Sequence, residues 1–201
     1  MPLRLGPTMI DSPPTAALKS STSERARYRS SREAEARLLL LIDGFSRDTA
    51  GARTLQGRVK LAKLDFLLRY PRHLATVLSQ RAKGTDAALE MLTLQDSPLE
   101  SRMMRYRYGP WDPSHFAILG ALVGRGLVEV VPAAGSKALG YRTTSIGAQL
   151  AASLLDDGAF DEVQQRIALL RRHLDLTGET LKRVLYELPE VADAAWHEEL
   201  T

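Results

Sequence analysis

The chain has 201 residues, of which 44% are hydrophobic, 25% are charged and none is cysteine. This length supports one ordinary hydrophobic core with extensions, and the lack of cysteine excludes disulfides and cysteine-ligated metal sites. The longest apolar run, "LLLLI" at 38–42, is far too short to cross a bilayer, and the N-terminus lacks the apolar stretch of a signal peptide. We therefore expect a cytoplasmic protein with no membrane association.

The charges are segregated along the chain. The net charge of +3 comes from residues 1–30, which hold five basic and two acidic side chains. Residues 51–142 carry 14 basic against 7 acidic groups, whereas residues 143–201 carry 5 against 11. This asymmetry favours a protein that offers one face to a polyanion and another to a basic partner. Charges that segregate along the sequence and mix on the folded surface are the alternative.

The N-terminal part predicts a tail followed by a helix. Residues 1–30 hold four of the ten prolines and little apolar periodicity, so we expect a disordered tail. Ser30 and Glu33 stand at capping-box spacing before an apolar run with helical periodicity. That pattern predicts a helix from Ser30 to the polar segment "SRDTAGART" (46–54), where it breaks.

A second helix is predicted by "GRVKLAKLDFLLRYP" (57–71), which places leucines on one face and meets Pro71 at its end. Asp65 lies within this apolar wheel. Because an isolated buried carboxylate is costly, we expect Asp65 to pair with an arginine. Residues 72–95 predict one or two further helices, divided at Gly84.

The stretch "MRYRYGPWDP" (104–113) predicts a sharp corner that is structural in its second half. A Gly-Pro pair forces a turn, Trp111 offers an apolar anchor, and Asp112 before Pro113 is typical of a helix start. The following helix, 114–125, ends at Gly126. The segments "GLVEVV" and "YRTT" then predict a β-hairpin with Lys137 near its tip, and "TTSIGAQLAASLL" returns to helix.

This order of elements predicts a mostly α protein with a small β-hairpin wing. We expect a winged-helix domain over residues 31–157 and a C-terminal helical extension with an acidic tail over residues 158–201. In such domains the helix before the hairpin is the usual reader of the DNA major groove.

The composition of helix 114–125 argues against that use. Its polar side chains are Ser114, His115 and Arg125, whereas base readout needs several polar groups facing the base edges. Sequence-independent phosphate contact remains a hypothesis for the basic residues Lys60, Lys63, Arg102, Arg105, Arg107 and Lys137. The alternative is that these arginines pair with local acids and stack on neighbouring tyrosines.

The C-terminal extension shows amphipathic helical spacing, with a second helix expected after Thr177. Glu190, Asp193, Glu198 and Glu199 surround Trp196 near the end. We interpret this region as a partner-binding surface formed by Phe160, Val163, Ile167, Leu181, Leu185 and Trp196. A frayed, solvated terminus is the alternative.

No catalytic or metal-binding pattern stands out. The chain has no glycine-rich phosphate loop with its lysine, no His-x-x-x-His pair and no Gly-x-Ser-x-Gly elbow. We therefore expect a protein that is not an enzyme and that holds neither a cofactor nor a metal.

Two blocks, "GRVKLAKLDFLLRYP" and "SRMMRYRYGPWDPSHFAILGALVGRGLVEV", resemble the winged-helix middle component of bacterial three-component defence systems. These systems are built around an ABC ATPase of the SMC/Rad50 type and include the Lamassu anti-phage systems. The similarity spans roughly residues 31–188. It is carried by the Lys-Leu-x-Lys-Leu-Asp core, the Tyr-Gly-Pro-Trp-Asp corner and the glycine before the wing.

The resemblance implies an accessory subunit that binds the ATPase and helps to couple the sensing of foreign phage or plasmid DNA to an effector, commonly a nuclease. The implied partners are the ATPase, the effector subunit and DNA, which is bound without sequence preference in the complex. A looser similarity to Panacea-type antitoxin domains leaves open a free-standing winged-helix DNA-binding regulator or antitoxin. Residues 1–30 have no counterpart in the resemblance.

Overall fold

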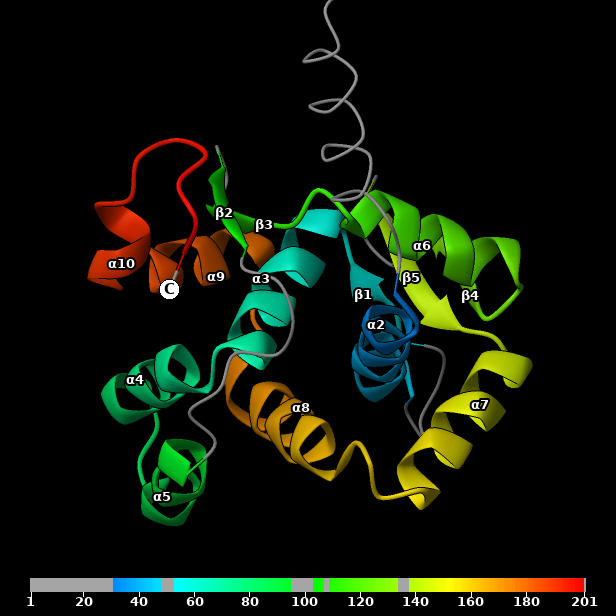
Figure 1. Cartoon of the computed structure of the whole chain (residues 1–201), viewed down its shortest axis with the longest axis horizontal. Helices are drawn as coiled ribbons and strands as arrows, with labels where there is room; N and C mark the ends of the chain where they lie inside the picture. The colour runs from blue at the N-terminus through cyan, green and yellow to red at the C-terminus, as the bar shows by residue number, and fades with distance from the viewer. Residues whose placement is uncertain (1–30, 48–52, 95–102, 107–108, 134–137, 201) are drawn as a thin grey trace, which may run out of the picture.

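A computed structural model of the chain describes residues 31–47, 53–94, 103–106, 109–133 and 138–200. The tail predicted for residues 1–30 lies outside these ranges. The protein is mostly helical, with a small three-stranded antiparallel sheet and a separate two-stranded hairpin (Figure 1).

The helices of the described residues follow one another in the order α2 (Arg32–Ser46), α3 (Arg58–Arg69), α4 (Pro71–Arg81), α5 (Asp86–Leu94), α6 (His115–Gly124), α7 (Ser145–Asp156), α8 (Asp161–Leu174), α9 (Gly178–Leu185) and α10 (Pro189–Ala192). The strands are β1 (Leu55–Gln56), β2 (Met104–Tyr106), β3 (Gly109–Trp111), β4 (Val128–Pro132) and β5 (Leu139–Thr143).

Local capping fixes several helix starts. The Ser31 hydroxyl accepts a hydrogen bond from the Ala34 backbone N–H at 3.0 Å, so α2 is capped one residue after the predicted Ser30. The Thr177 hydroxyl caps α9 in the same way, as the sequence predicted. Each cap satisfies a backbone donor that has no partner within its own helix.

The three-stranded sheet has the order β1-β5-β4. The predicted hairpin is confirmed: β4 and β5 pair antiparallel from Val128 opposite Thr143 to Pro132 opposite Leu139. The predicted tip residue, Lys137, lies outside the described residues. β1 was missed by the sequence analysis because two residues are too few to show an alternating pattern.

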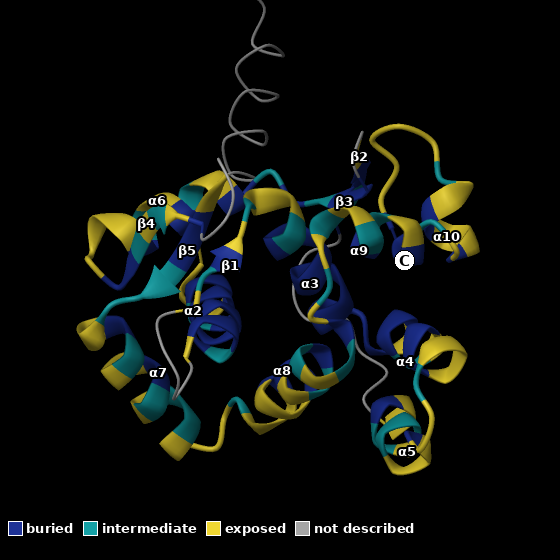
Figure 2. Cartoon of the chain, turned by 180° about the vertical axis from the view of Figure 1, so that it is seen from behind, coloured by how far each residue is buried: buried dark blue, intermediate teal, exposed yellow. Residues whose placement is uncertain are grey.

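Helix α2 lies at the centre of the fold and contacts β5, α6, α7 and α8. Its leucines and isoleucine are buried, and Figure 2 shows α2 and α3 largely in the colour of buried residues. Gly44 allows the close approach of α8, because a Cβ at this position would stand 2.5 Å from a methyl carbon of Ile167.

Residues after the predicted boundary at 157 belong to the same core. Helix α8 packs on α2 and α3, and α9 packs on α3. Their buried side chains form one cluster with those of the preceding helices. The helices of the C-terminal extension therefore belong to the same hydrophobic core as α3.

The acidic C-terminal segment is bound along β2, which rules out the frayed terminus considered from the sequence. The Arg105 N–H donates to the Glu198 carbonyl at 2.8 Å, and the His197 N–H donates to the Arg105 carbonyl at 2.9 Å. The Leu200 N–H donates to the Met103 carbonyl at 2.7 Å, and the Leu200 side chain is buried. The segment therefore holds the outer edge of the β2–β3 hairpin.

Candidate functional site

The corner at residues 104–116 begins as a β-hairpin, not as the simple turn that the sequence predicted. β2 and β3 pair antiparallel, with Met104 opposite Trp111 and Tyr106 opposite Gly109. Gly109 has a φ of 110°, which only glycine adopts readily, so the backbone requires glycine at the start of β3. Along β2 and the residue before it, Met103 and Arg105 are buried and Tyr106 is exposed, which is the alternation typical of a strand. The sequence analysis did not identify this strand.

The inward side of this corner is a buried ionic cluster beneath α6. The Arg37 Nε donates to Asp65 Oδ1 at 2.8 Å, which confirms the predicted pairing of Asp65 with an arginine. The Arg69 Nη1 donates to Asp112 Oδ2 at 2.8 Å and lies 3.6 Å from Asp65 Oδ2. The His115 Nε2 is 3.0 Å from the same Asp65 oxygen. Two guanidinium groups thus face two carboxylates, so the cluster joins α2, α3 and the start of α6.

Asp112 organises the start of α6. Its Oδ1 accepts hydrogen bonds from the Ser114 N–H at 2.8 Å and from the Ser114 hydroxyl at 2.6 Å. The helix begins at His115, one residue later than predicted, and Asp112 supports it through this turn as well as through Arg69. The predicted structural role of Asp112 therefore extends into the core.

The electrostatics of the cluster keep both carboxyls ionised. Burial by itself raises the pKa of Asp65, but Arg37, the neighbouring His115 and Arg69 outweigh burial and hold that pKa far below its usual range. Burial likewise opposes ionisation of Asp112, but Arg69 and the hydrogen bonds from Ser114 lower its pKa. The cluster is suited to holding the fold, because its charged groups point into the protein.

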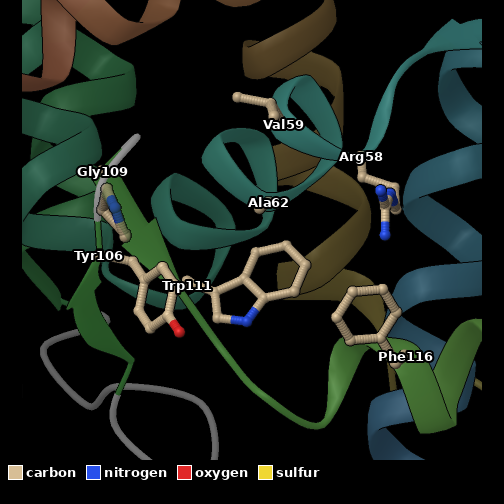
Figure 3. A pocket seen from close by; sticks show the side chains of 8 residues that line it. Arg58, Val59, Ala62, Tyr106, Gly109, Trp111 and Phe116 are labelled. Atoms are coloured by element: carbon tan, nitrogen blue, oxygen red, sulfur yellow. The ribbon is translucent and has the colours of Figure 1, made fainter. Parts of the chain in front are cut away.

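The outward side of the same corner is an open apolar groove of about 280 Å³ (Figure 3). Its walls come from the start of α3, the β2–β3 hairpin and the first turn of α6; the lining residues are Arg58, Val59, Ala62, Tyr106, Gly109, Pro110, Trp111 and Phe116. The rings of Trp111 and Phe116 meet edge to face, with centroids 5.4 Å apart. Trp111 is therefore both a partly buried anchor, as predicted, and a wall of the groove.

The outward face of α6 continues this apolar surface. Phe116 is 57% exposed and Val123 is 40% exposed, and the exposed Gly120 between them and Gly124 after them carry no side chain. Figure 2 shows exposed residues along α6 beside buried ones. A solvent-facing helix surface without polar side chains is unusual for a chain that functions without a partner.

The three polar residues predicted for this helix all face other parts of the protein. Ser114 is bound to Asp112, His115 is buried against Asp65, and the Arg125 guanidinium pairs with Glu35. The Arg125 side chain nevertheless remains 58% exposed. Ser114 and His115 therefore serve the start of α6 within the protein.

The predicted nucleic-acid contacts are corrected for two residues. Lys63 is buried, and its Nζ donates to the Gly178 carbonyl at 2.7 Å. Arg105 is buried, its Nε donates to the Val191 carbonyl at 2.8 Å, and its guanidinium lies over the Tyr186 ring. Lys63 is covered by the start of α9 and Arg105 by α10, and both donate to backbone carbonyls there. Neither side chain is therefore placed to contact a phosphate.

Lys60 forms an ion pair with Asp175, with 2.6 Å between Nζ and Oδ1. This ion pair joins α3 to the residue that follows α8. The other three predicted nucleic-acid contacts, Arg102, Arg107 and Lys137, lie outside the described residues.

The predicted partner-binding residues of the extension are corrected as well. Val163, Ile167, Leu181 and Leu185 are buried in the chain's own core, and Phe160 packs against it. The amphipathic spacing was interpreted correctly as a face that must be covered, but α2 and α3 provide the cover. Trp196 is the exception, since it is 62% exposed and stacks on Tyr106 with centroids 6.2 Å apart.

The groove residues Arg58 and Val59 were missed by sequence reasoning. The sequence did contain a signal for an exposed apolar surface on α6, where apolar side chains point to more than one face of the helix; these are Phe116, Leu119, Leu122 and Val123. Because a small core covers only one face, another apolar face of such a helix stays exposed.

Comparison with protein-family models, with characterised proteins and with solved structures found no match for the chain. Among the described residues, no cluster of histidine, aspartate or glutamate could hold a metal ion. None of the helices in those ranges has the length and hydropathy needed to cross a membrane.

Proposed function

We propose that the chain is a winged-helix adaptor that acts without catalysis, by docking a partner protein on α6 and the adjoining groove. The order α2, β1, α3, α6, β4, β5 and the sheet order β1-β5-β4 support the winged-helix assignment. In this assignment α4, α5 and the β2–β3 hairpin form an insertion between the second and third helices of the domain. The insertion supplies one wall of the groove.

The outward face of α6 is the observation that carries the proposal. This is the face that a DNA-reading winged helix turns to the major groove, and here it presents Phe116 and Val123 with small residues between them. Base recognition needs hydrogen-bonding groups, whereas burial against another protein needs apolar surface. The chemistry of the face favours a protein partner.

The resemblance to the middle component of three-component defence systems supplies the proposed partner. We assign the chain as an accessory subunit of an SMC/Rad50-like ABC ATPase that senses foreign phage or plasmid DNA and controls an effector nuclease. In this proposal the ATPase holds the DNA. The adaptor's described basic residues at 60, 63 and 105 serve its own fold.

Affinity purification of the tagged chain from its native host tests this assignment. We expect a coiled-coil ABC ATPase to co-purify with wild type and to be lost from the double variant Phe116→Asp, Val123→Asp, because both charges would be buried in the interface. Leu94→Asp is the matched control, since Leu94 is 84% exposed at the end of α5, outside the α6 face. It should retain the ATPase.

The alternative function predicts a different result. A free-standing regulator or Panacea-like antitoxin would purify without an ATPase and would enrich one short site from a random DNA pool. That outcome would refute the adaptor assignment.

A further inference from the structure

The groove between α3, the β2–β3 hairpin and α6 has a chemistry that defines its occupant more narrowly. Its volume of about 280 Å³ is at the lower limit of the roughly 300–1,000 Å³ usual for small-molecule and cofactor sites. The space suits one or two large side chains of a bound chain. The exposed parts of Val59, Tyr106 and Phe116 add apolar surface around the opening.

Arg58 stands at one end of the groove as an available cation. Its side chain is exposed, and its guanidinium carbon lies 5.0 Å from the centre of the Phe116 ring. It forms no ion pair with the residues that the structure describes. The ring contact holds the guanidinium at the groove's edge while leaving its N–H donors available, a geometry suited to a carboxylate.

The other end of the described surface has the opposite charge. Tyr106 stacks on Trp196, and the exposed side chains of Asp193, Glu198 and Glu199 lie in the same C-terminal segment. These acids would repel the regularly spaced phosphates of a nucleic acid that followed the aromatic rings from Phe116 to Trp196. A protein segment, in contrast, can present a different charge at each end.

We propose that this groove binds a short protein segment that carries an acidic residue beside a large apolar one. The apolar side chain packs in the groove against Trp111 and Phe116, and the neighbouring aspartate or glutamate pairs with Arg58. This inference deepens the proposed function, on which it rests for the existence of a protein partner. It names the chemistry of the partner segment at the same surface.

Selection from a phage-displayed library of random short peptides on the immobilised full chain tests the proposal. Counter-selection on Phe116→Asp removes peptides that bind elsewhere. We expect the enriched peptides to share an aromatic or branched apolar residue next to aspartate or glutamate. The best peptide is then synthesised with its acid intact and with the acid changed to the amide.

Fluorescence anisotropy of the two peptides isolates the ion pair. Changing the acid to the amide should weaken binding to wild type about 3- to 10-fold, the range of a partly exposed interfacial pair. Arg58→Ala should weaken the acidic peptide by the same factor and leave the amide peptide unchanged. Arg172→Ala is the matched control, because Arg172 is exposed on α8, outside the groove lining. Arg58→Glu should bind a lysine-containing peptide better than the acidic one.

Three results would overturn the proposal. They are a selection that enriches no peptide sensitive to Phe116→Asp, equal binding of the acid and amide peptides to wild type, and binding of single-stranded oligothymidine that disappears in Phe116→Asp. The last would assign the groove to nucleic acid. Because these assays use the isolated chain, peptide binding without a co-purifying ATPase would refute the assigned partner and leave the groove's chemistry standing.

Discussion

The segment 109–116 has two sides with different roles, one packed into the protein and one exposed at the groove. Inward, Asp112, Ser114 and His115 join Asp65 and the arginines in a buried polar cluster. Outward, Trp111 and Phe116 line an open groove that contains no buried charge. The inward residues make their contacts within the chain and hold α6 in place. The outward residues leave contacts available for a partner.

Removing the centre of the inward cluster should have the largest effect. Asp65→Ala deletes the carboxylate that Arg37, Arg69 and His115 all face, so the free energy of unfolding should fall by about 3–5 kcal/mol. Urea denaturation followed by circular dichroism measures this change. The exposed acid Asp157 offers a control, since Asp157→Ala should change stability by less than about 0.5 kcal/mol.

If Asp65→Ala does not fold, Asp65→Asn keeps the shape of the side chain and allows the measurement. A loss for Asp65→Asn no larger than that of the Asp157 control would show that the ionic cluster contributes little to stability. The division between the two sides of the segment would then fail.

The second largest effect should come from acid, which should lower the stability that the ionic cluster contributes. The pKa values of Asp65 and Asp112 are lowered in the folded protein, so the unfolded chain binds protons more tightly. Their contribution to stability is therefore complete above the unfolded carboxyl pKa of about 4 and is lost progressively as the pH falls below it. Urea midpoints measured from neutral pH into this acidic range should decrease.

The slope of that decrease identifies its source. Asp112→Asn removes one of the two groups, so its stability should depend less steeply on acidic pH than that of wild type. An unchanged slope would mean that other carboxyls cause the acid sensitivity.

The smallest effects on stability should come from the outward side. Trp111→Ala should cost about 1–2 kcal/mol, below the roughly 3–5 kcal/mol of a fully buried tryptophan, because its ring is only partly buried. Phe116→Ala should change the free energy of unfolding by less than about 0.5 kcal/mol, since Phe116 is 57% exposed. Thermal melts of both variants measure the difference. Equal losses for the two would make Phe116 a structural residue and weaken its role in docking.

Several features of the fold could be predicted because their causes are local. The start of α9 at Thr177, and that of α2 to within one residue, follow from side chains that cap nearby N–H groups. The β4–β5 hairpin follows from two β-rich runs joined by a turn. The buried partner of Asp65 was predictable in kind, because a carboxylate inside an apolar helix requires a cation. Which arginine supplies it was not.

The pattern of apolar and charged residues specifies which surfaces must be covered, and the packing of the helices selects what covers them. Ile167 and Leu181 required an apolar neighbour, and α2 and α3 provided it within the chain, whereas Phe116 had the same requirement and remained exposed. The environment of Arg105 was decided in the same way, since only the path of the C-terminal segment along β2 shows that this side chain points inward. Hydrophobic spacing and charge specify the kind of environment that each side chain needs. Which distant residue provides it depends on how the helices pack, and the whole core fixes that packing.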